Sequence, residues 1–124
     1  MTKKILIVED EETILELLSE IFGDTGDYRV LQARDGEEAL RMAQVARPDV
    51  ILLDIQLPKR NGHEVCKLVK TDPAMSHTKV LMISGMAQNL DWQKAREMGA
   101  DGYIAKPFSS ITLVEKVKEL LRSN

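Results

Sequence analysis

The strongest constraint on the fold is the alternation of short apolar runs with segments of helical periodicity. Five runs rich in β-branched residues are typical of buried strands. They are Lys3–Val8 (KKILIV), Tyr28–Ala33 (YRVLQA), Val50–Asp54 (VILLD), Lys79–Ser84 (KVLMIS) and Gly102–Lys106 (GYIAK). Apolar residues at helical spacing follow each run, as with Leu15, Leu18 and Phe22 after the first. This alternation predicts a doubly wound α/β fold, in which helices cover both faces of a five-stranded parallel sheet.

Several helix ends can be predicted from local residues. Asp35 is placed to cap the second helix, and Glu38 stands where a capping-box partner belongs. That helix should stop before Pro48, because the residue preceding a proline avoids the helical conformation. The third helix should end near Asp72–Pro73, and a weaker fourth helix should cover residues 91–98.

Length and composition narrow the classes of protein that fit. The 124 residues suit one domain, residues 1–124, with a real core. The net charge of −3 and the pI of about 5.4 argue against a domain that binds nucleic acid directly. The chain has neither an apolar run of the ~18 residues that a membrane span needs nor a signal peptide. We therefore expect no membrane partner.

The single cysteine and the two histidines argue against a disulfide and against a zinc site. A single cysteine, Cys66, excludes an intramolecular disulfide and a cysteine-rich zinc site. It indicates a reducing, cytoplasmic location and is expected to be a packing residue. His63 and His77 are not at ligand spacing, and both are expected at the surface.

Polar residues gather at the ends of the predicted strands. Ligands of open α/β sheets bind beyond the carboxyl ends of the strands, so we expect functional residues just after each strand. Glu9 and Asp10 follow the first strand, and Asp54, Ser84 and Lys106 end the third, fourth and fifth. Any one of them alone would be explained as a cap, a turn residue or a solvated charge. Because all five residues lie at strand ends, we infer that they belong to one common site.

The chemistry of this group suits phosphoryl transfer. Three clustered carboxylates repel one another unless a cation neutralises them, and Mg²⁺ suits a site with few protein ligands and several waters. Lys106 adds a positive charge, and Ser84 a hydroxyl donor. Together these residues supply a carboxylate nucleophile, a metal site, a lysine and a hydroxyl group.

Four motifs that carry these residues resemble the response-regulator receiver domain, the CheY-like fold. They are IVEDE with Glu9 and Asp10, LLDIQLPKRNG with Asp54, MISG with Ser84, and GADGYIAKPF with Lys106 and Pro107. The motifs span the chain in the family's order. The resemblance implies a sheet with strand order 2-1-3-4-5.

The resemblance also implies residue roles at the phosphorylation site. Asp54 matches the phosphoacceptor, which would become a 4-aspartylphosphate with a histidine kinase or phosphotransfer protein as donor. Asp10 matches the direct Mg²⁺ ligand, and Glu9 the acidic residue that acts through water. Gln56 would offer its backbone carbonyl to the metal. Ser84 matches the residue that senses the phosphoryl group.

Further implied roles concern the lysine and the output. Lys106 matches the family's lysine, Pro107 would follow it through a cis peptide bond, and Tyr103 matches the aromatic switch residue. A downstream protein would dock on the face made by the fourth helix, fifth strand and fifth helix. The domain would catalyse only its own phosphotransfer and autodephosphorylation.

Departures from the family pattern affect two expectations. Gly102 stands where an aspartate is frequent in OmpR-type regulators, which puts that dimer mode in doubt, so a monomer or weak dimer is expected. Gln56 and Met86 occupy positions that should tune the lifetime of the phosphoryl group.

Three alternative functions remain. An aspartyl-phosphate phosphatase of the haloacid dehalogenase kind needs a second aspartate two positions after the nucleophile, where this chain has Gln56. A flavodoxin shares the fold, but no phosphate-cradling loop follows the first strand. A degenerate receiver that acts only as a binding scaffold would not need all five site residues.

Overall fold

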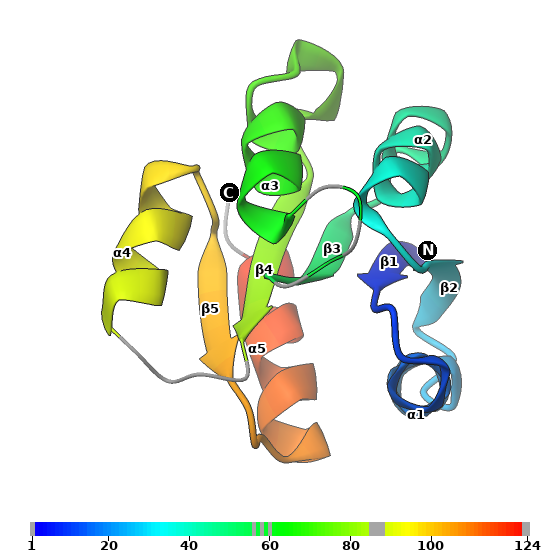
Figure 1. Cartoon of the computed structure of the whole chain (residues 1–124). Helices are drawn as coiled ribbons and strands as arrows, with labels where there is room; N and C mark the ends of the chain where they lie inside the picture. Colours follow the sequence, from blue (N-terminus) through cyan, green and yellow to red (C-terminus); the bar gives the residue numbers. More distant parts are fainter. Residues whose placement is uncertain (1, 56, 58, 60, 85–88, 123–124) are drawn as a thin grey trace.

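The computed structural model describes residues 2–55, 57, 59, 61–84 and 89–122, and it shows strands and helices alternating along the chain (Figure 1). The elements are β1 (Lys3–Val8), α1 (Glu12–Gly23), β2 (Tyr28–Ala33), α2 (Gly36–Ala46), β3 (Val50–Asp54), α3 (Gly62–Lys70), the 3₁₀ helix η1 (Pro73–Met75), β4 (Lys79–Ser84), α4 (Asn89–Glu97), β5 (Gly102–Ala105) and α5 (Ser110–Arg122). The alternation predicted from the sequence is confirmed.

The five strands form one parallel sheet in the order β2-β1-β3-β4-β5, as the resemblance implied. In this register Val8 pairs with Leu53, and Asp54 with Ile83. The carboxyl ends of β1, β3 and β4 therefore meet at one edge. The direction of winding reverses between β1 and β3, which is where ligands of such sheets bind.

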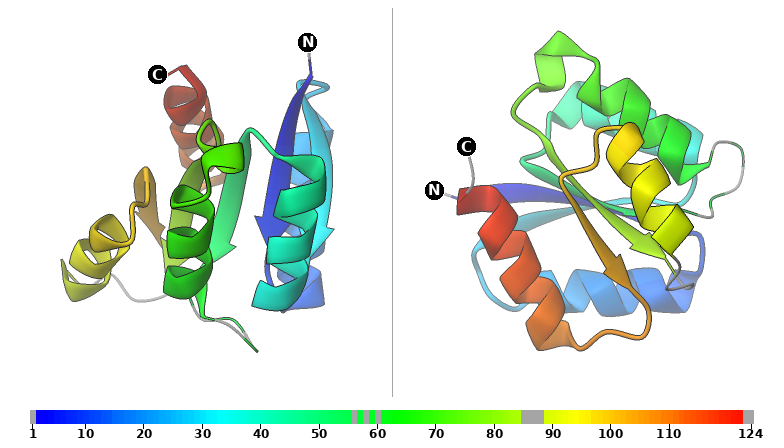
Figure 2. Two further views of the ribbon diagram at one scale, coloured as in Figure 1. Left: turned by 90° about the horizontal axis from the view of Figure 1, so that it is seen from above. Right: turned by 90° about the vertical axis from the view of Figure 1, so that its left-hand side faces the viewer.

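Each face of the sheet is covered by its own group of helices. Helices α1 and α5 lie on one face, and α2, α3 and α4 on the other (Figure 2). Successive side chains of a strand point to opposite faces, so Ile51 and Leu53 enter one core while Val50 and Leu52 enter the other. All four are at most 1% exposed, as befits a strand covered on both sides.

The cap of α2 differs in detail from the prediction. Asp35 is the cap residue, and its carboxylate accepts a hydrogen bond from the backbone N–H of Glu38 at 2.8 Å, as predicted. The Glu38 carboxylate, however, reaches back to the N–H of Arg34 at 2.7 Å, one residue before the cap. Helix α2 ends at Ala46, before Pro48, with Arg47 in the left-handed conformation at φ 48°.

Other boundaries and one side chain depart from expectation. Helix α3 ends at Lys70 instead of Asp72, because Asp72 caps η1 by accepting a hydrogen bond from Ala74 N–H at 2.9 Å. Helix α4 begins at Asn89, two residues earlier than predicted. His63 was expected at the surface, but it is only 6% exposed, since it faces inward from the first turn of α3.

None of the helices within the described residues is long and apolar enough to cross a membrane.

Candidate functional site at the strand ends

Asp54 is a buried carboxylate at the end of a fully buried strand. It is the last residue of β3 and is 8% exposed. The next residue continues the hydrogen bonding between β3 and β4, since Ile55 N–H donates to the Ile83 carbonyl at 3.0 Å. Neighbouring strands therefore fix the backbone on both sides of Asp54. A carboxylate in such a position costs free energy unless it is paired.

The partner of Asp54 is Lys106, which follows β5. The Lys106 ammonium lies 3.1 Å from Oδ2 of Asp54 and 3.6 Å from Oε1 of Glu9. The backbone N–H of Lys106 donates to the Ser84 carbonyl at 2.6 Å, which ties this residue to the end of β4. The Lys106–Pro107 peptide bond is cis, as the sequence analysis expects. The structure thus brings together residues from β1, β3, β4 and β5.

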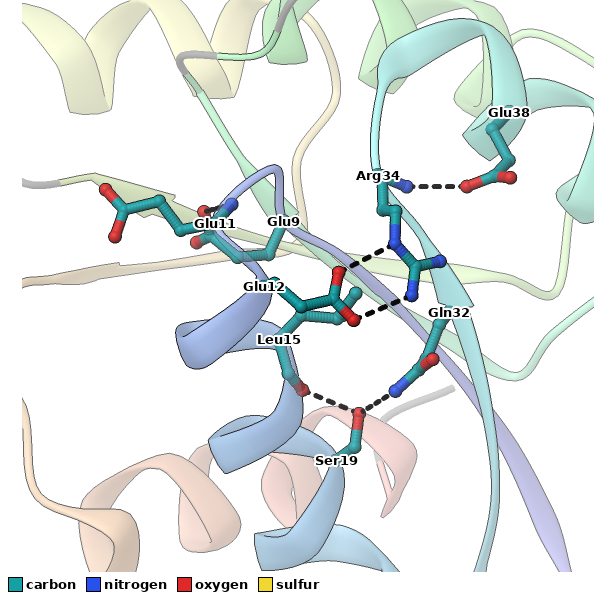
Figure 3. Close-up of polar contacts among 8 residues, drawn as sticks. All are labelled: Glu9, Glu11, Glu12, Leu15, Ser19, Gln32, Arg34 and Glu38. Atoms are coloured by element: carbon teal, nitrogen blue, oxygen red, sulfur yellow. Dashed lines mark hydrogen bonds and ion pairs between the residues drawn. The ribbon is translucent and has the colours of Figure 1, made fainter.

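Glu9 is the most buried of the acidic residues at this edge. It is 3% exposed, and its Oε2 accepts a hydrogen bond from Glu11 N–H at 3.1 Å (Figure 3). Burial raises the pKa of Glu9 to about 7, with the charge of Asp54 and a hydrogen bond with Asp10 adding to the rise. The Glu11 N–H and the charge of Lys106 oppose that rise only in part. These carboxylates are therefore close enough to repel one another.

Lys106 stays protonated in this setting. Burial lowers the pKa of its ammonium group, but the hydrogen bond and charge of Asp54, together with Glu9, outweigh that effect and raise the pKa above its ordinary value. Lys106 is therefore a cation that two carboxylates share at this edge of the sheet.

The donor chemistry at this edge fits Mg²⁺ held by few side chains. In the part of the chain that the structure describes, no group of three or more His, Cys, Asp or Glu side chains is arranged to enclose a metal. Asp10 is exposed beside the buried Glu9 and Asp54, so carboxylate oxygens face both solvent and the sheet edge. Mg²⁺ usually keeps several waters and binds through one or two carboxylates. Gln56, the predicted source of a carbonyl ligand, lies outside the described residues.

Ser84 and Tyr103 lie on the same side of the sheet. Ser84, 5% exposed, pairs with Ala105, and Tyr103 pairs with Met82. Paired residues of parallel strands share a face, so Ser84 and Tyr103 project toward the layer of α3 and α4. Tyr103 is half-buried and packs against that core.

Gly62 has a structural role that the sequence analysis missed. A Cβ atom at this position would overlap the carbonyl oxygen of Asp54 and would lie 2.7 Å from Cα of Ile55. The Gly62 N–H donates to the Ile55 carbonyl at 2.8 Å, and Asn61 caps α3 by accepting from Glu64 N–H. Only glycine permits this close approach. The Asn-Gly pair after the third strand is the sequence feature that could have indicated this role of Gly62.

An ion pair near the site links two segments that are distant in the sequence. The Arg34 guanidinium donates to both carboxylate oxygens of Glu12, at 2.8 and 2.9 Å (Figure 3). This contact joins the start of α1 to the end of β2. Both side chains are about half exposed, so the pair contributes little to overall stability. No local pattern predicts this pair, because the two residues are 22 positions apart in the sequence.

Cys66 lies on the inner side of α3 and is fully buried. Burial raises the pKa of its thiol to about 12, so the thiolate is not formed near neutral pH. The prediction that Cys66 is a packing residue agrees with this placement.

The raised pKa of Glu9 predicts how stability depends on pH in metal-free protein. An unfolded Glu9 loses its proton near pH 4.5, whereas the folded one keeps it to about 7. The folded state therefore binds more protons over this interval, and its stability falls as pH rises through it. Glu9→Gln should relieve that loss by on the order of 1 kcal/mol or more at pH 8, relative to pH 4.

Urea unfolding with a chelator present, at pH 4 and pH 8, measures this difference. Glu16→Gln, at an exposed position of α1, is the matched control and should follow wild type. Equal pH dependence in wild type and Glu9→Gln would contradict the assignment.

Comparisons with known proteins agree with this fold and show the family of the chain. The family model of the response regulator receiver domain matches residues 5–118. PhoP of Bacillus subtilis, named an alkaline phosphatase synthesis transcriptional regulatory protein, is 43% identical over 122 residues. The polar-differentiation response regulator DivK of Brucella abortus (strain 2308) is 38% identical over 121 residues. The match covers 98% of this chain in both cases, but 50% of PhoP and 98% of DivK.

A solved structure shows the same likeness. The chemotaxis response regulator CheY4 of Vibrio cholerae superimposes with a TM-score of 0.90 at 33% identity, covering 97% of this chain and 99% of CheY4. Fold, family model and relatives therefore agree, and the chain belongs to the response regulator receiver family of two-component signalling.

Proposed function

We propose that this chain is a phosphorylation switch whose phosphoacceptor is Asp54. The observation that carries the proposal is the Lys106 ammonium 3.1 Å from a buried carboxylate at the switch point of the sheet. The donor is the phosphohistidine of a histidine kinase or phosphotransfer protein. An Asp54 carboxylate oxygen forms a bond to phosphorus while the P–N bond breaks, and the released imidazole takes up a proton. The product is 4-aspartylphosphate.

Lys106 would stabilise the transfer by charge. Phosphoryl transfer depends mainly on positioning and on neutralising the charge that spreads over the phosphoryl oxygens. The ammonium group already lies against Asp54, so it needs little movement to contact a phosphoryl oxygen there. Ser84, at the end of β4, would donate its hydroxyl proton to the same group.

Three groups of this chain would hold Mg²⁺: the carboxylates of Asp10 and Asp54 and the carbonyl of Gln56, with Glu9 acting through a water. When bound, the ion neutralises charge on the carboxylates and the phosphoryl oxygens. The burial of Glu9 and Asp54 at this edge supports the role, since it sets two carboxylates close together there, and burial of Glu9 raises its pKa to about 7. The chain would not be an enzyme that acts on other molecules: it would catalyse only the phosphotransfer to itself and its own dephosphorylation.

Output would pass from Ser84 to Tyr103 on their shared face of the sheet. A phosphoryl group on Asp54 would draw the Ser84 side chain toward it, and Tyr103 would rotate into the vacated space. The surface formed by α4, β5 and α5 would then present a different shape to a downstream protein. The phosphoryl group needs only to bias two packings that are close in free energy. We propose that the downstream partner is a cytoplasmic protein and that this chain makes no direct contact with nucleic acid. We also propose that residues 1–124 form one receiver domain.

The phosphoacceptor can be tested with acetyl phosphate and Mg²⁺. Wild type should gain the mass of one phosphoryl group and lose it in hydroxylamine, which cleaves acyl phosphates. Asp54→Asn should be labelled at less than roughly a tenth of the wild-type rate, because an amide is a poor nucleophile. Asp49→Asn, at an aspartate away from this edge, is the control and should be labelled normally. Full labelling of Asp54→Asn would refute the assignment.

The metal site can be tested by thermal unfolding. A ligand that binds only the folded state stabilises it by about 2.7 kcal/mol when its concentration is 100 times Kd. Added Mg²⁺ should therefore raise the Tm of wild type by several degrees, and Asp10→Ala should abolish the rise. Glu11→Ala is the control, since that exposed side chain makes no cap hydrogen bond. An equal Mg²⁺ response in Asp10→Ala would rule out this ligand set.

The output route can be tested by NMR with beryllofluoride and Mg²⁺ as a mimic of the phosphoryl group. Chemical-shift changes in wild type should spread from Asp54 to Tyr103. Ser84→Ala should retain the changes near Asp54 but lose most of those at Tyr103, whereas the exposed control Ser76→Ala should match wild type. Unchanged Tyr103 shifts in Ser84→Ala would mean that the signal takes another route.

A further inference from the structure

Another partly buried ion pair lies at the edge of the sheet opposite Asp54. The ammonium group of Lys70, the last residue of α3, lies 2.9 Å from Oδ2 of Asp101, the residue before β5. Only 18% of the Lys70 side chain and 22% of the Asp101 side chain are exposed. Water and salt therefore screen this pair less than a pair on the open surface, so we expect it to hold both side chains in place.

Asp101 is also bonded twice to Val80, near the start of β4. Its backbone N–H donates to the Val80 carbonyl at 2.9 Å, and its Oδ2 accepts from the Val80 N–H at 2.8 Å. The Lys70 ammonium donates in addition to the carbonyl of Thr78 at 2.9 Å, just before β4. These two side chains, which we call the Lys70–Asp101 clamp, thus fix where the chain that enters β5 meets β4.

The turn that leads from α4 into β5 rests on α3. Gly99 in this turn has a φ of 94°, and a Cβ atom there would lie 3.1 Å from the Cβ of Lys70. One turn earlier on α3, the Cys66 thiol donates to the carbonyl of Met98 at 3.7 Å. The stem of Lys70 is therefore packed against backbone, and its ammonium group starts from a fixed position.

Strand β5 has little else that specifies its register. It is an edge strand of four residues that pairs with β4 (Figure 1). Its first residue, Gly102, has no side chain. Of its four residues, Ile104 alone belongs to the core on the side of α1 and α5, and Tyr103 is half-buried on the other face. Register is well specified where an apolar pattern fills a buried face and weakly specified in short strands with glycine. The bonds at the two ends of β5 therefore matter for its register.

We propose that Lys70 and Asp101 are positioning residues for phosphoryl transfer, because they set the register of β5 and so place Lys106 beside Asp54. Lys106 follows β5 at the far edge of the sheet, roughly 16 Å from Asp101 at the usual rise of a strand. Its N–H donates to the Ser84 carbonyl at 2.6 Å, and its ammonium group lies 3.1 Å from Asp54. A slip of one residue would displace it by about 3.3 Å. The inference rests on the proposed phosphorylation of Asp54.

Hydrogen exchange of the Lys106 amide measures the register without any phosphorylation. Asp101→Ala removes the carboxylate that binds the Val80 N–H and Lys70, so the Lys106 amide should exchange about tenfold faster. The amide of Ile55, which joins β3 to β4, should keep its protection. Asp101→Asn should restore most of the protection at Lys106, because its amide oxygen still accepts from the same groups.

Labelling by acetyl phosphate tests the link to the chemistry. At saturating acetyl phosphate and Mg²⁺, folded Asp101→Ala should be labelled about tenfold more slowly than wild type, since a misplacement of about 1 Å can cost on the order of a hundredfold. Its Mg²⁺ affinity, followed by the rise in Tm, should not fall, because the proposed ligands come from the ends of β1 and β3. A variant that is only less stable would keep the wild-type rate below its Tm. Asp24→Ala and Lys67→Met, at exposed positions, are the controls.

A double variant tests whether the two residues act as one unit. Lys70→Met keeps a stem beside Gly99 but removes the ammonium group, and it should slow labelling about threefold. Added to Asp101→Ala, Lys70→Met should slow labelling no further, because its partner is already gone.

Three results would overturn the proposal. They are labelling of Asp101→Ala at the wild-type rate, equal acceleration of exchange at Lys106 and Ile55, and additive losses in the double variant. Failure of the proposed function differs from these, since wild type itself would then take no label. The exchange comparison would in that case still decide whether the Lys70–Asp101 clamp sets the register of β5.

Discussion

The pairing of the Lys106 ammonium with the buried Asp54 carboxylate is the interaction on which the rest of the site depends. A carboxylate that is 8% exposed at the end of an apolar strand needs a cation nearby. Lys106 provides it at 3.1 Å, but it also serves Glu9 at 3.6 Å. One positive charge thus lies between two carboxylates, and burial, with the charge of Asp54 adding to its effect, raises the pKa of Glu9 to about 7. Lys106 thus ties the ends of β1, β3 and β5 together at one edge of the sheet.

The fold produces this pairing from segments that are far apart in sequence. Lys106 and Asp54 are separated by 52 positions, and they meet because β4 lies between β3 and β5 with a parallel register. Gly62 adds a second constraint, since its backbone lies against the carbonyl of Asp54. The strand that presents the carboxylate is therefore held on both sides, by β1 and β4, and at its end by the start of α3.

Much of this could be predicted because it depends on local patterns. Apolar runs and helical spacing located the elements, and Asp35 could be recognised as a cap from its own neighbourhood. Features that arise from packing between distant segments could not be predicted in the same way. The overlap that reserves position 62 for glycine and the burial of His63 require the arrangement of the sheet and its two layers. The charged residues at the strand ends are an intermediate case. Their clustering at one edge could be predicted from a parallel sheet, but the distances between them could not.

The most direct test of the central claim is to locate the phosphoryl group chemically. Borohydride reduces an aspartyl phosphate to homoserine, which peptide mass spectrometry can place at a single position. After treatment with acetyl phosphate and Mg²⁺, the account predicts homoserine at position 54 in wild type, and much less of it in Lys106→Met, where the neutralising ammonium group is gone. Homoserine at another aspartate, or equal amounts at position 54 in both proteins, would contradict it.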